Sequence, residues 1–253
     1  MMPQDTMSQK HYSKAPIVEA IVDIQVKMAE GFSHEAFNAV HAELGERFPI
    51  KSPMKMVEMR MEADAITGEG SHSSTATDIG LRLTNKDNSR VIQLRTNGFT
   101  FSHMPPYTEW KVLREEAYQT WLVFVATCKP KTVVRCALRF VNRIDIPKPS
   151  IELHDYFHLY PEIPTGIPQD VSGMFMQLQM PQTDLEGMAI INQAVVDPTT
   201  PGTMSVLLDF DLFQVRDYAP DDEAIWHLLD KLRDRKNELF EACITDKIRG
   251  LID

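Results

Sequence analysis

One stretch constrains the fold more than any other part of the sequence: VVRCALRFVNRIDIP at residues 133–147. Its apolar residues recur at every second position, interrupted at Asn142, and its charged residues occupy the positions between them. Successive side chains of a β-strand point to opposite faces, so this period of two predicts a long strand with one apolar and one charged face. Residues 16–27 repeat the pattern, which indicates a sheet that is covered on one side only.

The other periodic segments give an order of elements along the chain. After the strand at 16–27 we expect a helix that begins near Ser33, four strands and a second helix with Thr108 as its N-cap. After the strand at 133–147 we expect a short helix from Ser150, strands and a long helix that runs from Pro220-Asp221 to the C-terminus. The predicted strands between the helices are residues 54–66, 79–85, 89–96, 98–104, about 173–181, 187–197 and 204–214.

This order predicts an α+β protein with helices on one face of an antiparallel sheet. Residues 1–130 and residues 131–253 each give a strand, a helix, further strands and a helix. We therefore expect two topologically similar halves that share one continuous sheet. The arrangement resembles the saddle-shaped TATA-binding-protein-like fold or a helix-grip fold, a resemblance that implies architecture and no function.

Composition is that of an ordinary soluble protein. The 253 residues are 43% hydrophobic, and no apolar run approaches the roughly 20 residues that cross a bilayer. The first ten residues are polar, so we expect no secretory signal, no membrane association and a cytoplasmic location. The three cysteines, Cys128, Cys136 and Cys243, lie far apart beside apolar segments, which predicts buried free thiols.

The net charge of −10 is distributed unevenly. Residues 1–150 contain 19 basic and 17 acidic residues, a net of +2, whereas residues 151–253 contain 7 and 19, a net of −12. The second half should repel polyanions, so nucleic acid is an unlikely partner. A protein partner or a small anionic ligand is the expectation, and the oligomeric state is left open.

Two stretches near the ends of the chain are similar to known sequences. YSKAPIVEAIVDI from Tyr12 and FEACITDKIRGL from Phe240 resemble the motifs YxxAPIxEA and FxxxITDxIR of a sporadically distributed family of uncharacterised bacterial proteins. The resemblance implies no activity and no catalytic residue. The patchy distribution of that family suggests a horizontally transferred defence or toxin–antitoxin system.

The charged face of the predicted sheet contains the candidate binding residues. If the first strands of the two halves are neighbours, Glu19 and Asp23 should lie near Arg139 and Arg143 and form cross-strand ion pairs. The alternative is a pocket for a phosphate or carboxylate, because arginine binds these anions in a bidentate manner. The candidate ligand-binding residues are Arg139, Arg143, Arg95, Glu19, Asp23, Asp209 and Asp211.

The leading functional hypothesis is a non-catalytic binding or regulatory protein whose open polar face captures a protein segment or a small anionic ligand. We assign no catalytic residue, no metal and no cofactor, because the sequence has no phosphate-binding glycine loop, no GxSxG motif and no recognisable Cys/His dyad. The alternative is a metal-dependent hydrolase or nuclease. Asp209 and Asp211 would lie on one strand face, as such a metal site requires.

Overall fold

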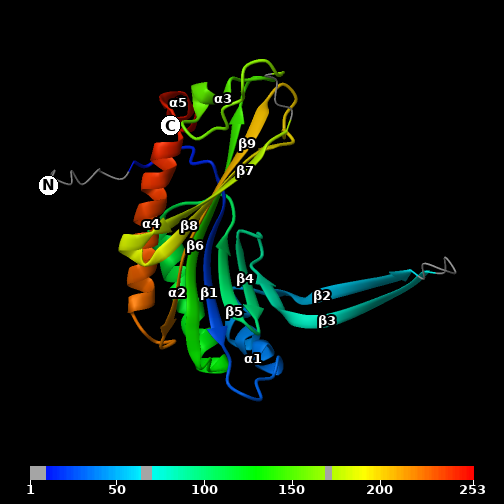
Figure 1. Cartoon of the computed structure of the whole chain (residues 1–253). Helices are drawn as coiled ribbons and strands as arrows, with labels where there is room; N and C mark the ends of the chain where they lie inside the picture. Colours follow the sequence, from blue (N-terminus) through cyan, green and yellow to red (C-terminus); the bar gives the residue numbers. More distant parts are fainter. Residues whose placement is uncertain (1–9, 64–69, 169–172) are drawn as a thin grey trace.

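A computed structural model of the chain describes residues 10–253 except 64–69 and 169–172, and it leaves undescribed the side chains of 60–63 and 70–72. Nine strands form one antiparallel sheet in the order β2-β3-β4-β5-β1-β6-β9-β8-β7. Figure 1 shows this sheet with α2 and α4 on the same side of it. The prediction of an α+β fold with an antiparallel sheet is confirmed.

The strands differ widely in length, and the longest are β3, β6 and β9. The predicted strands at 16–27 and 133–147 are confirmed as β1 and β6, which pair with each other at the centre of the sheet. The strands are β1 Ile17–Lys27, β2 Ile50–Ala63, β3 Gly70–Thr84, β4 Arg90–Arg95, β5 Gly98–His103, β6 Thr132–Ile146, β7 Phe175–Gln182, β8 Gly187–Val196 and β9 Met204–Tyr218.

The helices are short except for two. They are α1 Glu35–Leu44, α2 Trp110–Cys128, α3 Leu153–Tyr156, α4 Ala224–Cys243 and α5 Asp246–Ile252, with a 3₁₀ turn at Thr183–Leu185. The prediction of one helix running to the C-terminus is wrong, because Ile244 forms an isolated bridge with Phe157 and Thr245 has an extended backbone. In the described part of the chain, no helix has the length and apolar character needed to span a bilayer.

The core lies between the sheet and the helices. The apolar positions of the two central strands, among them Val22, Ile24, Leu138 and Phe140, are almost fully buried. α2 contacts β1 and β5, and α4 contacts β6 and β9, so each long helix covers one half of the sheet. The three cysteines are free and buried, as the sequence predicts.

The strand order reads in the same way outward from the central pair. In the first half, β1 is followed by β5, β4, β3 and β2, and in the second half β6 is followed by β9, β8 and β7. In both halves the first strand is therefore central and the last strand lies beside it. The two halves share one sheet, but internal duplication and the saddle or helix-grip comparison stay predictions.

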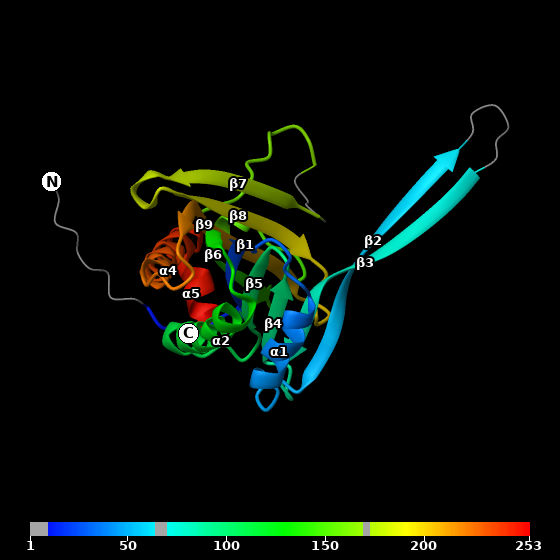
Figure 2. The same cartoon turned by 90° about the horizontal axis from the view of Figure 1, so that it is seen from below.

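The hairpin of β2 and β3 leaves the body of the protein. Strand β4 pairs with β3 only as far as Gly80, whereas β2 and β3 continue to pair from Lys55–Asp78 to Ala63–Gly70. A register shift after Met54 marks a bulge at the point where the hairpin departs. A Cβ on Gly80 would lie 2.1 Å from the carbonyl oxygen of Leu94, so the close approach of β4 requires glycine there. Figures 1 and 2 show the hairpin projecting away from α4.

Candidate functional site

The face of the sheet opposite α2 and α4 contains a ladder of ion pairs, which we call the polar ladder: Arg95, Asp23, Arg135, Asp211, Arg139 and Asp209. Its members come from β4, β1, β6 and β9, so four strands contribute to it. They share this face because their positions alternate with the buried positions of the same strands.

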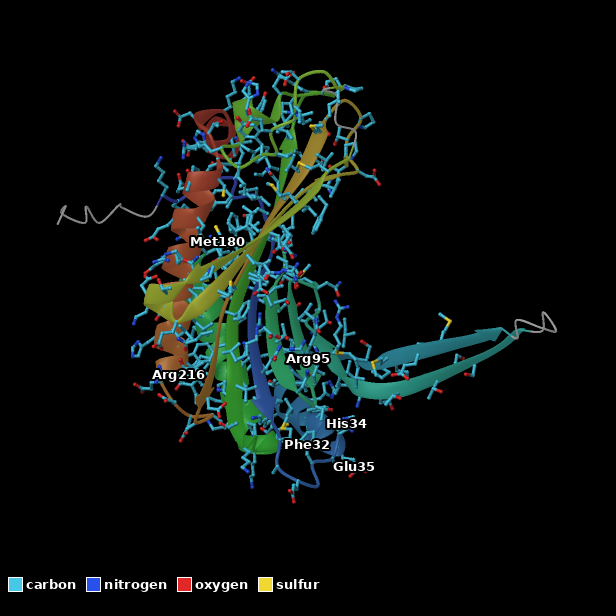
Figure 3. The ribbon with its side chains drawn as sticks, viewed as in Figure 1. Phe32, His34, Glu35, Arg95, Met180 and Arg216 are labelled. Atoms are coloured by element: carbon cyan, nitrogen blue, oxygen red, sulfur yellow. The ribbon has the colours of Figure 1, made fainter. Side chains whose placement is uncertain are left out.

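Asp23 is the centre of one end of the ladder. Its carboxylate accepts hydrogen bonds from the guanidinium of Arg95, from the Thr100 hydroxyl at 2.7 Å and from Arg135 at 3.2 Å. Thr100 lies directly opposite Asp23 on the neighbouring strand β5, and Arg135 is a diagonal neighbour on β6. In Figure 3, Arg95 lies near the root of the projecting hairpin, so this end of the ladder adjoins the hairpin.

Arg135 links the two halves of the sheet. One nitrogen donates to Asp23 in the first half, and another donates to Asp211 of β9 at 3.2 Å. Its guanidinium also lies over the ring of Phe213, with 4.2 Å between the central carbon and the ring centroid. Burial raises the pKa of Asp211 above the ordinary value for a carboxyl group, although Arg135 and Arg139 oppose this shift.

Arg139 and Asp209 form the most regular pair of the ladder. Two guanidinium nitrogens of Arg139 donate to the two carboxylate oxygens of Asp209, each at 2.8 Å, and this bonding raises the pKa of Arg139. Asn192 of β8 donates a further hydrogen bond to Asp209 at 2.9 Å, and Gln177 of β7 donates to Asn192. The polar network therefore reaches the edge strand.

Arg143 belongs to a separate cluster further along β6. It donates to Asp145 at 3.1 Å, to the Ser205 hydroxyl at 3.0 Å and to the carbonyl oxygen of Asp197 at 2.7 Å. Ser205 in turn donates to Asp145. Nε and one terminal nitrogen of Arg143 thus have acceptors within the chain.

The expected pairing of Glu19 and Asp23 with Arg139 and Arg143 is wrong in its partners. The central strands are neighbours as predicted, and their register places Asp23 opposite Ala137, diagonal to both Arg135 and Arg139; its carboxylate accepts from Arg135. Arg139 turns to Asp209 instead, because β9 pairs with β6 on the other side and supplies carboxylates there. Glu19 acts on Arg139 only through its charge.

The ladder is electrically balanced. Three arginines, Arg95, Arg135 and Arg139, are paired with three aspartates, Asp23, Asp209 and Asp211. The side chain of Arg139 is 47% exposed, whereas that of Asp209 is 7% exposed, so this pair presents its guanidinium edge rather than its carboxylate to solvent. An incoming anion would have to displace an aspartate from each arginine. This geometry weakens the anion-pocket alternative.

The two aspartates proposed for a metal site do lie on one face of β9, two residues apart. Each is engaged by arginine, and no third acidic or histidine ligand is adjacent: within the described residues, no group of three or more His, Cys, Asp or Glu side chains could hold a metal ion. The arrangement of these side chains therefore favours ion pairing over metal ligation.

Lys236 of α4 is a buried charged residue that the sequence interpretation passed over. It is 7% exposed, and its ammonium lies 4.2 Å from the ring centroid of Phe140 and 5.9 Å from that of Phe240. Burial lowers its pKa to about 7, with a smaller contribution from Arg233. Lys236 lies four residues after Leu232 and four before Phe240, so the spacing of the apolar stripe could have placed it in the core.

The two stretches that resemble family motifs meet in space. The Tyr12 hydroxyl donates to Glu241 at 2.5 Å, and Arg249 donates to the same carboxylate at 3.0 Å. The backbone N–H of Lys14 donates to the carbonyl oxygen of Ile252 at 2.9 Å. These contacts assign the motif residues a structural role, which is to join the start of β1 to the C-terminal helices.

Substitutions at the two ends of the Arg135 bridge should differ in effect. We expect Asp23→Asn to lower the free energy of unfolding by about 1.5–3 kcal/mol at pH 7, because hydrogen bonds to charged groups are lost at a mostly buried position. Asp211→Asn should change it by less than about 1 kcal/mol. Folding raises the pKa of Asp211, so the free energy of unfolding falls as the pH rises through the range in which Asp211 ionises. Asparagine does not ionise, so Asp211→Asn removes this loss of stability. Urea denaturation of both variants measures which one loses more free energy of unfolding. Equal losses in Asp23→Asn and Asp211→Asn would contradict this prediction.

Comparison of the chain with models of known protein families and with curated proteins finds no match.

Proposed function

We propose that the chain is a non-catalytic binding protein that captures a protein segment on its open sheet face. The observation that supports this proposal is the combination, on one face, of a charge-balanced polar ladder with exposed apolar side chains. Phe175 of β7 and Val215 of β9 are 69% and 70% exposed, and the strand registers place both on the face of the ladder.

A protein segment suits this face better than a small anion does. Each arginine of the ladder already has an aspartate partner, so the face offers little uncompensated positive charge. Exposed apolar residues beside neutralised polar groups are typical of protein interfaces. Regulation through such binding, and a link to mobile defence or toxin–antitoxin genes, stay predictions.

Selection of a random peptide library on the purified protein tests this proposal. We expect enriched peptides to bind the wild type in calorimetry and to bind Val215→Asp at least tenfold more weakly, because a charge replaces apolar contact area. Leu122→Asp is the matched control, since Leu122 is an exposed apolar residue on α2, which covers the opposite face. Its affinity should equal that of the wild type.

Two results would contradict the proposal. One is a library that yields no peptide whose binding depends on Val215. The other is tight binding of inorganic phosphate or citrate to the wild type that is lost in Arg139→Gln, which would indicate an anion site instead. Metal-dependent hydrolysis abolished by Asp211→Asn would support the enzyme alternative.

A further inference from the structure

The part of the β2–β3 hairpin beyond Gly80, which we call the arm, is a two-stranded ribbon without a third strand. Nine residue pairs, from Lys55–Asp78 to Ala63–Gly70, lie outside the reach of β4. At about 3.3 Å per residue the arm is about 30 Å long. Isolated two-stranded ribbons are marginally stable in water, so an arm of this length is expected to be covered in the functional state.

Both faces of the arm expose apolar side chains. Met59 is 78% exposed and Val57 is 59% exposed, and the intervening alternation of the strand places Met56, also exposed, on the other face. The outer edge of β2 has no neighbouring strand among the described residues. A long apolar edge strand of this kind is a site of association between chains.

The open face of the sheet has an exposed strip that is about as long as the arm. We call this strip, which runs from Phe175 of β7 to Val215 of β9, the seat. Phe175 is aligned with Leu207 through Ala194, and Val215 lies eight residues further along β9. The strip from Phe175 to Val215 is therefore about 26 Å long, close to the length of the arm. On β7 and β8 the polar side chains of this strip, Gln177 and Asn192, are uncharged, and on β9 its two aspartates, Asp209 and Asp211, are each paired with an arginine. At the root of the arm, Lys55 is paired with Asp78.

We infer that the occupant of the open face is the arm of a second copy of this chain, and that two copies exchange arms about a twofold axis. This inference rests on the proposed function and identifies the captured segment. One face of the arm measures about 30 by 10 Å, so a single docked arm buries only about 600 Å² in total, less than a stable complex needs. Two exchanged arms bury about 1,200 Å², which reaches the range of stable dimers.

Sedimentation velocity of the full chain at micromolar concentration tests the exchange. We expect a dimer for the wild type and for Leu122→Asp, and at least a tenfold higher dissociation constant for Met59→Asp in the arm and for Phe175→Asp in the seat. All these positions are exposed, so the variants should stay folded, which circular dichroism confirms.

A mixture of the two interface variants gives the decisive readout. In a homodimer of either variant both arm contacts are damaged, whereas the mixed dimer keeps one intact contact, between the wild-type arm of Phe175→Asp and the wild-type seat of Met59→Asp. One intact contact of about 600 Å² is more than either variant homodimer keeps and less than the wild type has, so the mixed dimer should dissociate less readily than either variant homodimer and more readily than the wild-type dimer. A wild type that is still monomeric at about 100 μM, which means a dissociation constant too weak for a stable dimer, or a dimer that neither substitution weakens, overturns the inference. If peptides still bind through Val215 to a monomer, the proposed function stands and only the inference fails.

Discussion

Replacement of Lys236 by methionine is expected to stabilise the protein by about 3–5 kcal/mol at pH 7. The lysine is buried between Phe140 and Phe240, and its ammonium has no hydrogen-bond or ion-pair partner among the residues that the structure describes. Its pKa falls from 10.5 to about 7 on folding, and each unit of such a shift corresponds to about 1.4 kcal/mol. Methionine fills similar space without a charge.

The sign of the pH dependence follows from this shift. Between pH 7 and pH 10.5 the unfolded chain holds a proton on Lys236 that the folded chain releases, so stability rises with pH across this window. The advantage of Lys236→Met should therefore be largest at pH 7 and below and should shrink towards pH 10. Urea denaturation at pH 6.5 and pH 9.5 measures the difference.

Lys231→Met is the control for this experiment, because Lys231 lies on the same helix and is exposed. Lys231→Met should change the free energy of unfolding only slightly, and by the same amount at both pH values. An unchanged or lower stability of Lys236→Met at pH 6.5 would show that the ammonium reaches a partner or solvent.

The second large effect is expected from Leu138→Ala, which should lower the free energy of unfolding by about 2–5 kcal/mol. Leu138 is fully buried on the central strand β6, opposite Val22 on one side and Leu212 on the other. Removal of its side chain leaves a cavity between two rigid strands and the helices, where little relaxation is possible. A loss below about 1 kcal/mol in urea denaturation would contradict this placement of the core.

Val215→Ala provides the comparison for Leu138→Ala. It removes apolar atoms from a side chain that is largely exposed on the other face of the sheet, so its effect on unfolding should be small. The contrast between the two variants measures how completely the helices cover one face and leave the other open.

It could be predicted from sequence that helices cover only one face of the sheet, because the alternation of apolar and polar residues along a single strand is a local property. The partners of Arg139 and of Asp23 could not, because they depend on the register between strands whose paired residues, such as Arg139 with Asp209 and Arg135 with Asp23, are 70 and 112 residues apart in the chain. The burial of Lys236 could not be predicted for a different reason. The sequence places Lys236 in the apolar stripe of its helix, but lysine side chains usually lie in solvent. The arm was not predicted because β3 begins at Gly70, whereas the sequence pattern indicates a strand only from residue 79.

The central pairing of β1 with β6 has a consequence for biosynthesis. Strand β1 is synthesised long before its neighbour β6, which begins at residue 132, and the segment that leads into β1 is tied through Lys14 to Ile252. Contacts of such long sequence separation slow folding. An emerging first half would therefore expose one edge of its central strand until β6 follows, which makes this interval of synthesis the one in which a chaperone would protect the chain.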